Sequence, residues 1–132
     1  MLPPNLMTNR STADALRARQ AEAVPTKPKP NLDGYRSKLE RQYADHLEWL
    51  RTTSEIRAWY YEPVKLRLAR LTHYTPDFLV VLADGALELH EVKGFWRDDA
   101  RVKIKVAADK YGGMFRFVAV ERKHGAWMYE RF

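Results

Sequence analysis

The stretch YTPDFLVVLADGALELHEVKGFWRDDAR, residues 74–101, contains two apolar runs separated by a turn. Asp84-Gly85 between the runs is typical of a β-hairpin, and the runs themselves predict its two strands because apolar and β-branched residues suit a pleated surface. Asp77 stands at the start of the first strand, and Glu91 and Lys93 stand near the end of the second. Two carboxylates and a lysine where most strand ends are uncharged indicate metal-dependent phosphodiester chemistry.

The length of the hairpin loop decides whether these charged residues meet. A two-residue loop would place Asp77 opposite Val92, on the wrong face for Glu91. A three-residue loop, residues 83–85, with Gly85 in the left-handed region and a bulge, pairs Asp77 with Glu91. We predict this second register, in which one face of the hairpin carries alternate residues: Asp77, Leu79, Val81, Leu87, Leu89, Glu91 and Lys93.

The charged end of the hairpin fits a site for a hard cation. Mg²⁺ prefers oxygen ligands, so we expect Asp77 and Glu91 to bind it together with the backbone carbonyl of Val92. Lys93 lies beside Glu91, where it would orient an attacking water or neutralise charge on a phosphate. The alternative is a surface ion pair, with Asp77 only opening the strand after Pro76. Carboxylates on a face filled with Leu and Val favour the metal site, because buried charge needs compensation.

A helix is expected to precede the hairpin, over residues 38–51. Apolar residues recur in it at intervals of three and four, which is the spacing of a helix face that packs on a sheet: Leu39, Tyr43, Leu47 and Leu50. Ser37 and Glu40 fit a capping box, in which each side chain binds the other residue's backbone amide. That box is the structural explanation for Glu40, and a ligand for a second metal is the functional one.

Other segments are expected to add further strands and a second helix, which predicts an α/β fold. Residues 56–62 and 64–69 are rich in β-forming residues. Asp98 is expected to cap a helix over residues 98–111, followed by a strand over residues 115–120 that runs parallel to the Glu91 strand through a right-handed crossover. A turn at His124-Gly125 then leads to a last strand, residues 127–132.

The composition fits one folded domain after a loosely attached segment. Hydrophobic residues make up 45% and charged residues 30% of the chain, as in globular domains. Residues 1–34 are basic and proline-rich, which favours a flexible segment with a short helix over residues 11–23. Residues 35–132 suffice for an independent core. The net charge of +6 favours a polyanionic partner, although a charged surface for solubility explains it equally well.

Sequence features also bear on the compartment. The chain has no cysteine, which excludes disulfides and thiolate metal sites and fits a reducing compartment. No apolar run reaches membrane-spanning length, and the first residues lack the apolar region of a signal peptide. We therefore expect a cytoplasmic protein without membrane contacts.

The order of these motifs resembles that of the PD-(D/E)xK nuclease superfamily. Pro76-Asp77 followed by Glu91-Val92-Lys93 matches its signature. The longer series is SKLE at 37–40, YTPDF at 74–78, a short hairpin, VKGFW at 92–96 and the start of a basic helix. This series resembles phage endonuclease I, a family of junction-resolving enzymes, and related small phage and prophage proteins. The resemblance covers residues 35–121.

The resemblance implies a restriction-endonuclease-like fold, a mixed central sheet flanked by helices, with an αβββαβ core over residues 35–132. It further implies that Asp77 and Glu91 bind divalent metals, Mg²⁺ or Mn²⁺, that Lys93 is the catalytic lysine, and that Glu40 assists a metal. Relatives of the junction-resolving type are homodimers whose two active sites nick opposed strands of a four-way junction.

We therefore expect a metal-dependent endodeoxyribonuclease that resolves branched DNA, such as Holliday junctions, in phage recombination or DNA processing. A phage-encoded protein of this type would act in the host cytoplasm. Basic residues near the site are expected to contact DNA phosphates: Arg41, Arg97, Arg101, Lys103 and Lys105. Two alternatives are a nicking or repair nuclease that acts on ordinary duplex, and an inactive DNA-binding or assembly protein. The four site residues favour an enzyme, because a binding module has no need of acids that repel phosphate.

Overall fold

The structure is a computed structural model that describes residues 33–132, so the helix predicted over residues 11–23 and the proline-rich segment lie outside the described residues. The described part contains two helices and seven strands, which occur along the chain as follows: α2 (Lys38–Thr52), β1 (Ile56–Tyr61), β2 (Leu66–Ala69), β3 (Thr72–Tyr74), β4 (Phe78–Leu82), β5 (Leu87–Lys93), α3 (Asp98–Tyr111), β6 (Arg116–Lys123) and β7 (Ala126–Arg131).

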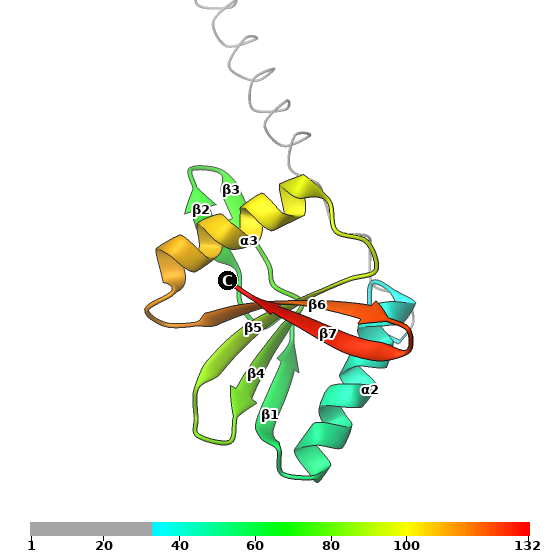
Figure 1. Cartoon of the computed structure of the whole chain (residues 1–132). Coiled ribbons are helices and arrows are strands. Elements are labelled where there is room, and N and C mark those ends of the chain that lie inside the picture. The colour runs from blue at the N-terminus through cyan, green and yellow to red at the C-terminus, as the bar shows by residue number, and fades with distance from the viewer. Residues whose placement is uncertain (1–32) are drawn as a thin grey trace, which may run out of the picture.

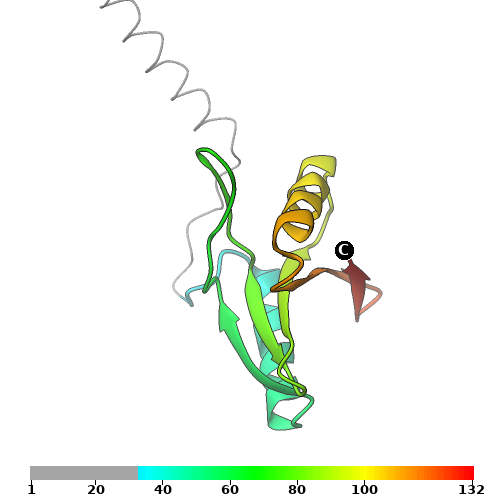
Figure 2. The same ribbon diagram turned by 90° about the vertical axis from the view of Figure 1, so that its left-hand side faces the viewer.

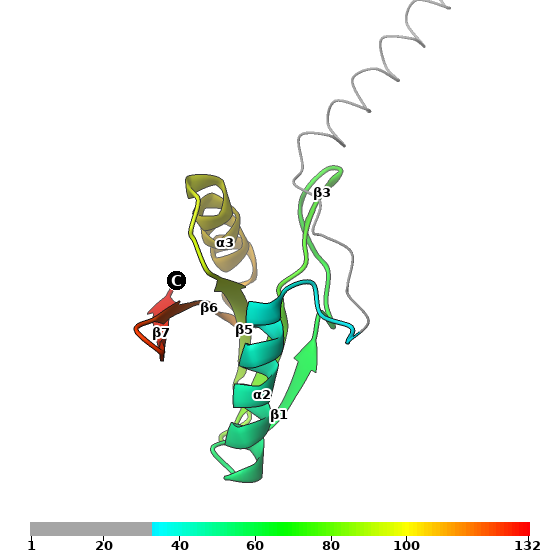
Figure 3. The ribbon, with the colours of Figure 1, turned by 90° about the vertical axis from the view of Figure 1, so that its right-hand side faces the viewer.

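The main sheet has five strands in the order β1-β4-β5-β6-β7 (Figure 1). β5 and β6 are parallel and are connected through α3, whereas the other neighbours are antiparallel. α2 and α3 pack on opposite faces of this sheet, as the two side views show (Figures 2 and 3). The predicted α/β architecture, a mixed sheet flanked by helices, is confirmed.

The central hairpin has the predicted register. Leu79 pairs with Leu89 and Val81 with Leu87. The Leu82 amide donates to the Ala86 carbonyl over 2.9 Å, which leaves residues 83–85 as the loop. Gly85 has a φ of +89°, in the region where a side chain would be strained. Continued to the end of the strands, this register sets Asp77 opposite Glu91.

The alternation of side chains along the strands divides the core in two. On one face, α2 packs through Tyr43 and Leu47 against a cluster that includes Phe78, Val80 and Val120. On the other face, α3 packs against a second cluster: Leu66, Tyr74, Leu89, Ile104, Ala107, Phe117 and Ala119. The sheet is therefore buried on both faces, and a polar residue within it must find partners inside the protein.

The strand predicted over residues 64–69 is present as β2, but it lies outside the main sheet. It pairs with β3, a strand that was not predicted, in a separate two-stranded sheet. Leu71, with a φ of +58°, turns the chain between the two strands. This small hairpin matters for the site because it ends at Tyr74, which it holds against α3 and the sheet.

The predicted N-terminal cap is present in α2 but not in α3. The Ser37 hydroxyl accepts a hydrogen bond from the Glu40 amide over 3.1 Å, as predicted for the cap of α2. The prediction that Asp98 caps α3 was wrong, because Arg97 occupies the cap position without a side-chain cap bond. Asp98 and Asp99 instead lie in the first turn, where negative charge interacts favourably with the helix dipole.

Candidate metal and phosphate site

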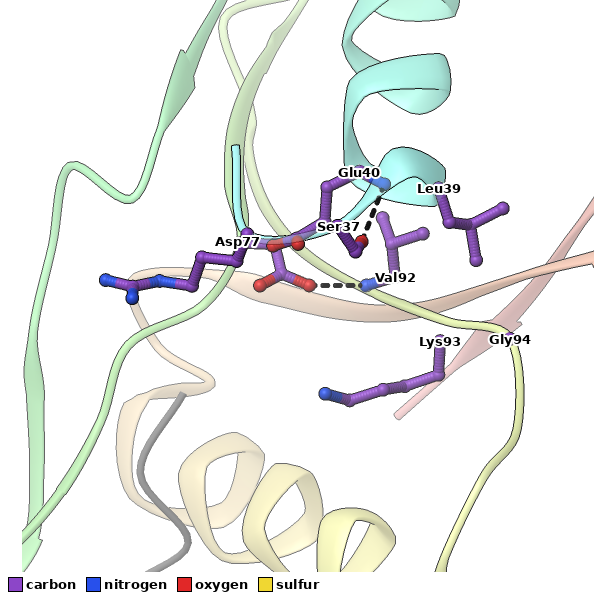
Figure 4. A pocket seen from close by; sticks show the side chains of 8 residues that line it. Ser37, Leu39, Glu40, Asp77, Val92, Lys93 and Gly94 are labelled. Atoms are coloured by element: carbon purple, nitrogen blue, oxygen red, sulfur yellow. Dashed lines mark hydrogen bonds between the residues drawn. The ribbon is translucent and has the colours of Figure 1, made fainter. Parts of the chain in front are cut away.

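A pocket of about 320 Å³ lies where the start of α2 meets the ends of the two central strands. It is lined by Arg36, Ser37, Leu39, Glu40, Asp77, Val92, Lys93 and Gly94. In Figure 4 the side chains of Glu40 and Lys93 lie on either side of the Asp77 carboxylate. Three of the four residues predicted to be catalytic therefore line one pocket, although they come from α2, the start of β4 and the end of β5.

Asp77 is 2% exposed and is fixed from the neighbouring strand. Its Oδ2 atom accepts a hydrogen bond from the Val92 amide over 2.8 Å. The N–H and C=O of one residue in a strand point to the same side, so the Val92 carbonyl is expected to face Asp77 as well. This arrangement is compatible with the predicted carbonyl ligand.

Glu40, Glu62 and Asp77 each offer a carboxylate oxygen, and these oxygens lie within 4.8 Å of one another. Glu40 is 6% exposed, so two of the three carboxylates are buried. A group of this kind consists only of oxygen donors, which suits a hard divalent cation. The residues present therefore fit Mg²⁺ or Mn²⁺.

Sequence analysis missed Glu62, which follows β1 directly. The Glu62 amide donates to the Asp77 carbonyl over 2.8 Å, and this bond continues the pairing of Tyr61 with Phe78. The signal that could have found Glu62 is therefore the β1–β4 register. The local sequence does not reveal that register, because Pro63 indicates only a break in the strand.

Glu91 lies opposite Asp77 in the hairpin, as predicted, and its carboxylate makes contacts of its own. It is not a member of the group formed by Glu40, Glu62 and Asp77, and it does not line the pocket. Its Oε2 accepts a hydrogen bond from the Tyr74 hydroxyl over 2.9 Å, and its Oε1 lies 3.2 Å from Lys93 Nζ. Glu91 thus contacts both the buried Tyr74 and Lys93, and Lys93 itself lines the pocket.

Cations and hydroxyl donors offset the negative charge of the site. Arg36 binds both oxygens of Glu62, at 2.7 and 3.0 Å. The Tyr61 hydroxyl donates to Glu40 over 3.2 Å. Burial raises the pKa of the Tyr61 phenol and that of the Tyr74 phenol, so both remain protonated donors at neutral pH.

The basic residues predicted to contact DNA come from two helices and from the residue that precedes the second. Arg41 is exposed in the first turns of α2 and pairs with Asp33 at 2.6 Å. Arg101 pairs with Glu130 on β7. Arg97 is the residue before the first turn of α3, and Lys103 and Lys105 lie within this helix. These last three are accessible to different degrees, with Arg97 and Lys105 exposed and Lys103 half-buried.

Comparison of the chain with protein-family models, with curated proteins and with solved structures found no match. Within residues 33–132, neither helix has the length and apolar character needed to cross a membrane.

Proposed function

We propose that this protein is a metal-dependent endonuclease that hydrolyses DNA phosphodiester bonds. The observation that carries this proposal is the convergence of three carboxylates, from α2, from the residue after β1 and from the residue before β4. Two of them, Glu40 and Asp77, line a pocket that Lys93 also lines. Acids that only needed solvation would lie on the surface, because burying a charge is costly.

Glu40, Glu62 and Asp77 would hold the metal, with the Val92 carbonyl beside them. A bound Mg²⁺ or Mn²⁺ supplies positive charge that polarises the scissile phosphate. The predicted ligand Glu91 would contribute through a rearrangement towards the pocket or through its contact with Lys93.

Lys93 is well placed to act on the phosphate. Its side chain is 36% exposed and lines the pocket, and the Glu91 carboxylate holds its ammonium group. In hydrolysis a water attacks phosphorus and one ester P–O bond breaks. The ammonium would orient that water or neutralise the charge that develops on the phosphate oxygens. Glu91, fixed by Tyr74, would keep the ammonium in place.

Branched DNA, such as a Holliday junction, is the substrate that the motif resemblance favours, and a homodimer with two such sites would suit it. Arg41, Arg97, Arg101, Lys103 and Lys105 are the proposed phosphate contacts. Such contacts position a nucleic acid without reading its sequence, so the proposal is a nuclease that is selective for DNA shape.

A second candidate is an inactive DNA-binding or assembly protein of the same fold. One observation favours it: Asp77, Glu62 and Glu91 already have partners in the protein, namely the Val92 amide, Arg36 and Lys93. Carboxylates compensated in this way persist without a metal. The two candidates therefore differ in whether the pocket binds a divalent cation and cuts DNA.

One experiment separates these functions. The protein is incubated with a synthetic four-way junction and with a matched linear duplex, in Mg²⁺ or in EDTA, beside Asp77→Asn and Glu91→Gln variants. Cleavage of the junction alone, lost in EDTA and in Asp77→Asn, supports the junction-resolving enzyme. Equal cutting of both DNAs supports a nicking or repair nuclease. Binding without cutting in Mg²⁺ and in Mn²⁺ supports the inactive protein and overturns the proposal. Circular dichroism establishes that both variants are folded.

A further inference from the structure

The connection between β5 and α3 presents an aromatic side chain beside the pocket. β5 ends at Lys93 and α3 begins at Asp98, and Gly94, which lines the pocket, follows the lysine directly. Phe95 comes next and is 79% exposed. Among the exposed large hydrophobic side chains of residues 33–132, Phe95 has the highest exposed fraction.

Trp96, the next residue, is much less exposed than Phe95. Trp96 is half-buried and packs against the core cluster beneath α3. The connection therefore anchors one ring and leaves the adjacent ring in solvent. Trp96 anchors the connection, and Phe95 stands between it and Gly94, which lines the pocket. An exposed apolar residue is common by itself, but this one directly follows two residues that line the pocket, Lys93 and Gly94.

The distance from Phe95 to the lysine suits a single nucleotide. Two residues of extended chain span at most about 7 Å, which limits the separation of the Lys93 and Phe95 backbones. Arg97, which is exposed on the same connection, adds positive charge. A phosphate at Lys93 would thus place an adjacent base within reach of the ring.

We propose that Phe95 stacks on an unpaired base next to the scissile phosphate, and that this contact selects DNA with an unpaired nucleotide over continuous duplex. The inference rests on the proposed function and names its substrate class. Aromatic side chains stack on any base, because every base has a π-face. In continuous duplex both faces of each base are already stacked, so Phe95 gains a partner only where a branch, flap or gap leaves a base free.

The test uses binding rather than cleavage. The Asp77→Asn variant, which keeps Lys93, is titrated in Mg²⁺ with a flapped duplex that carries 2-aminopurine as the first unpaired nucleotide. Stacking on Phe95 quenches the fluorescence of this base. We expect quenching on binding, its loss with Phe95→Ala, and flap affinity about 5- to 100-fold weaker in that variant. Phe95→Trp is expected to retain both properties.

Met114→Ala is the matched control, because Met114 is 68% exposed beyond the far end of α3 and should leave both readouts unchanged. Unchanged quenching and affinity in Phe95→Ala would overturn the inference. Equal affinity of the parent for flap and for plain duplex would also overturn it. A failure of the proposed function is separate: the wild-type protein would then cut no DNA, while quenching would still report whether Phe95 stacks.

Discussion

Two Glu-x-Lys pairs lie at the ends of adjacent parallel strands, and their surroundings differ. Glu91 and Lys93 end β5, while Glu121 and Lys123 end β6, and the two strands are paired so that Lys93 is beside Glu121. The first pair has its atoms 3.2 Å apart with a carboxylate 6% exposed, and the second is 3.5 Å apart with a carboxylate 29% exposed. The same three-residue pattern therefore produces one pair with a buried carboxylate and one pair on the surface.

The difference shows that the Glu-x-Lys motif alone does not form a site, and that residues from neighbouring helices and strands are also needed. Glu91 is joined to Tyr74 from β3, and Lys93 shares a pocket with Asp77 from β4 and Glu40 from α2. Glu121 and Lys123 line a smaller pocket next to β7, where exposed pairs of this kind contribute little to stability. Lys93 is thus expected to be functional and Lys123 is expected to be dispensable.

The largest effect expected from this comparison is on DNA cleavage. Lys93→Ala removes the ammonium from the pocket and should lower kcat by about 10³-fold, as losses of groups that stabilise transition-state charge do. Lys123→Ala removes the corresponding group of the surface pair and should change kcat less than about twofold, because exposed pairs are worth little. Rates are measured under single-turnover conditions on the preferred DNA. Comparable losses in the two variants would remove the distinction between the pairs.

Metal binding provides the next largest effect. Glu62→Gln keeps the shape of the side chain but removes one of the three charges of the group formed by Glu40, Glu62 and Asp77, so affinity for Mn²⁺ should fall about 10- to 100-fold. Calorimetric titration without DNA measures this directly. Glu130→Gln, an exposed acid paired with Arg101, serves as the matched control. An unchanged Mn²⁺ affinity in Glu62→Gln would exclude Glu62 from the site and restore the predicted ligand pair of Asp77 and Glu91.

The parts of the fold that depend on residues close together in the sequence, such as a turn or the apolar spacing of a helix, could be predicted. The three-residue loop followed from the face that Asp77 and Glu91 had to share, and the apolar spacing of α2 located Glu40. The position of Glu62 could not be predicted, because it depends on the pairing of β1 with β4 across sixteen intervening residues, which no local pattern specifies. The contact between Tyr74 and Glu91 depends on β3, a three-residue strand too short for periodicity to reveal.

β5 also carries a third pair of polar residues, on its other face. Glu88 and His90 point towards α2, where the Tyr43 hydroxyl lies 2.6 Å from His90 Nδ1, and His90 Nε2 lies 3.1 Å from Glu88. Arg131 closes the network at 2.6 Å from the other Glu88 oxygen. Within residues 33–132, every buried side-chain nitrogen or oxygen has a hydrogen-bond partner. This network lines neither the pocket that contains Lys93 nor the smaller pocket beside β7, so we assign it to stability.

Glu88→Gln should therefore destabilise the fold by about 1–2 kcal/mol and leave cleavage unchanged. The hydrogen bond with His90 lowers the pKa of Glu88 to about 2, below its ordinary 4.5. A carboxylate whose pKa is lower in the folded than in the unfolded protein stabilises the fold at any pH above its unfolded pKa. For Glu88 this stabilisation is therefore lost as the pH falls from 4.5 towards 2. Thermal melts at several pH values should show the variant losing less stability across that window. Loss of activity in a folded variant would instead connect the network to the site.

The smallest effect is expected at the Tyr74 hydroxyl, which donates a hydrogen bond to Glu91. Tyr74→Phe keeps the packed ring but removes the hydrogen bond to Glu91, a change worth about 1 kcal/mol. If Tyr74 positions Glu91 for Lys93, kcat should fall about fivefold while KM for DNA stays constant. Tyr111→Phe is the control, because it deletes a hydroxyl bound to the Arg67 carbonyl at the junction of α3 and β2. A purely structural role for Tyr74 would lower the melting temperature in both variants and leave kcat unchanged, which would make the burial of Glu91 a matter of packing alone.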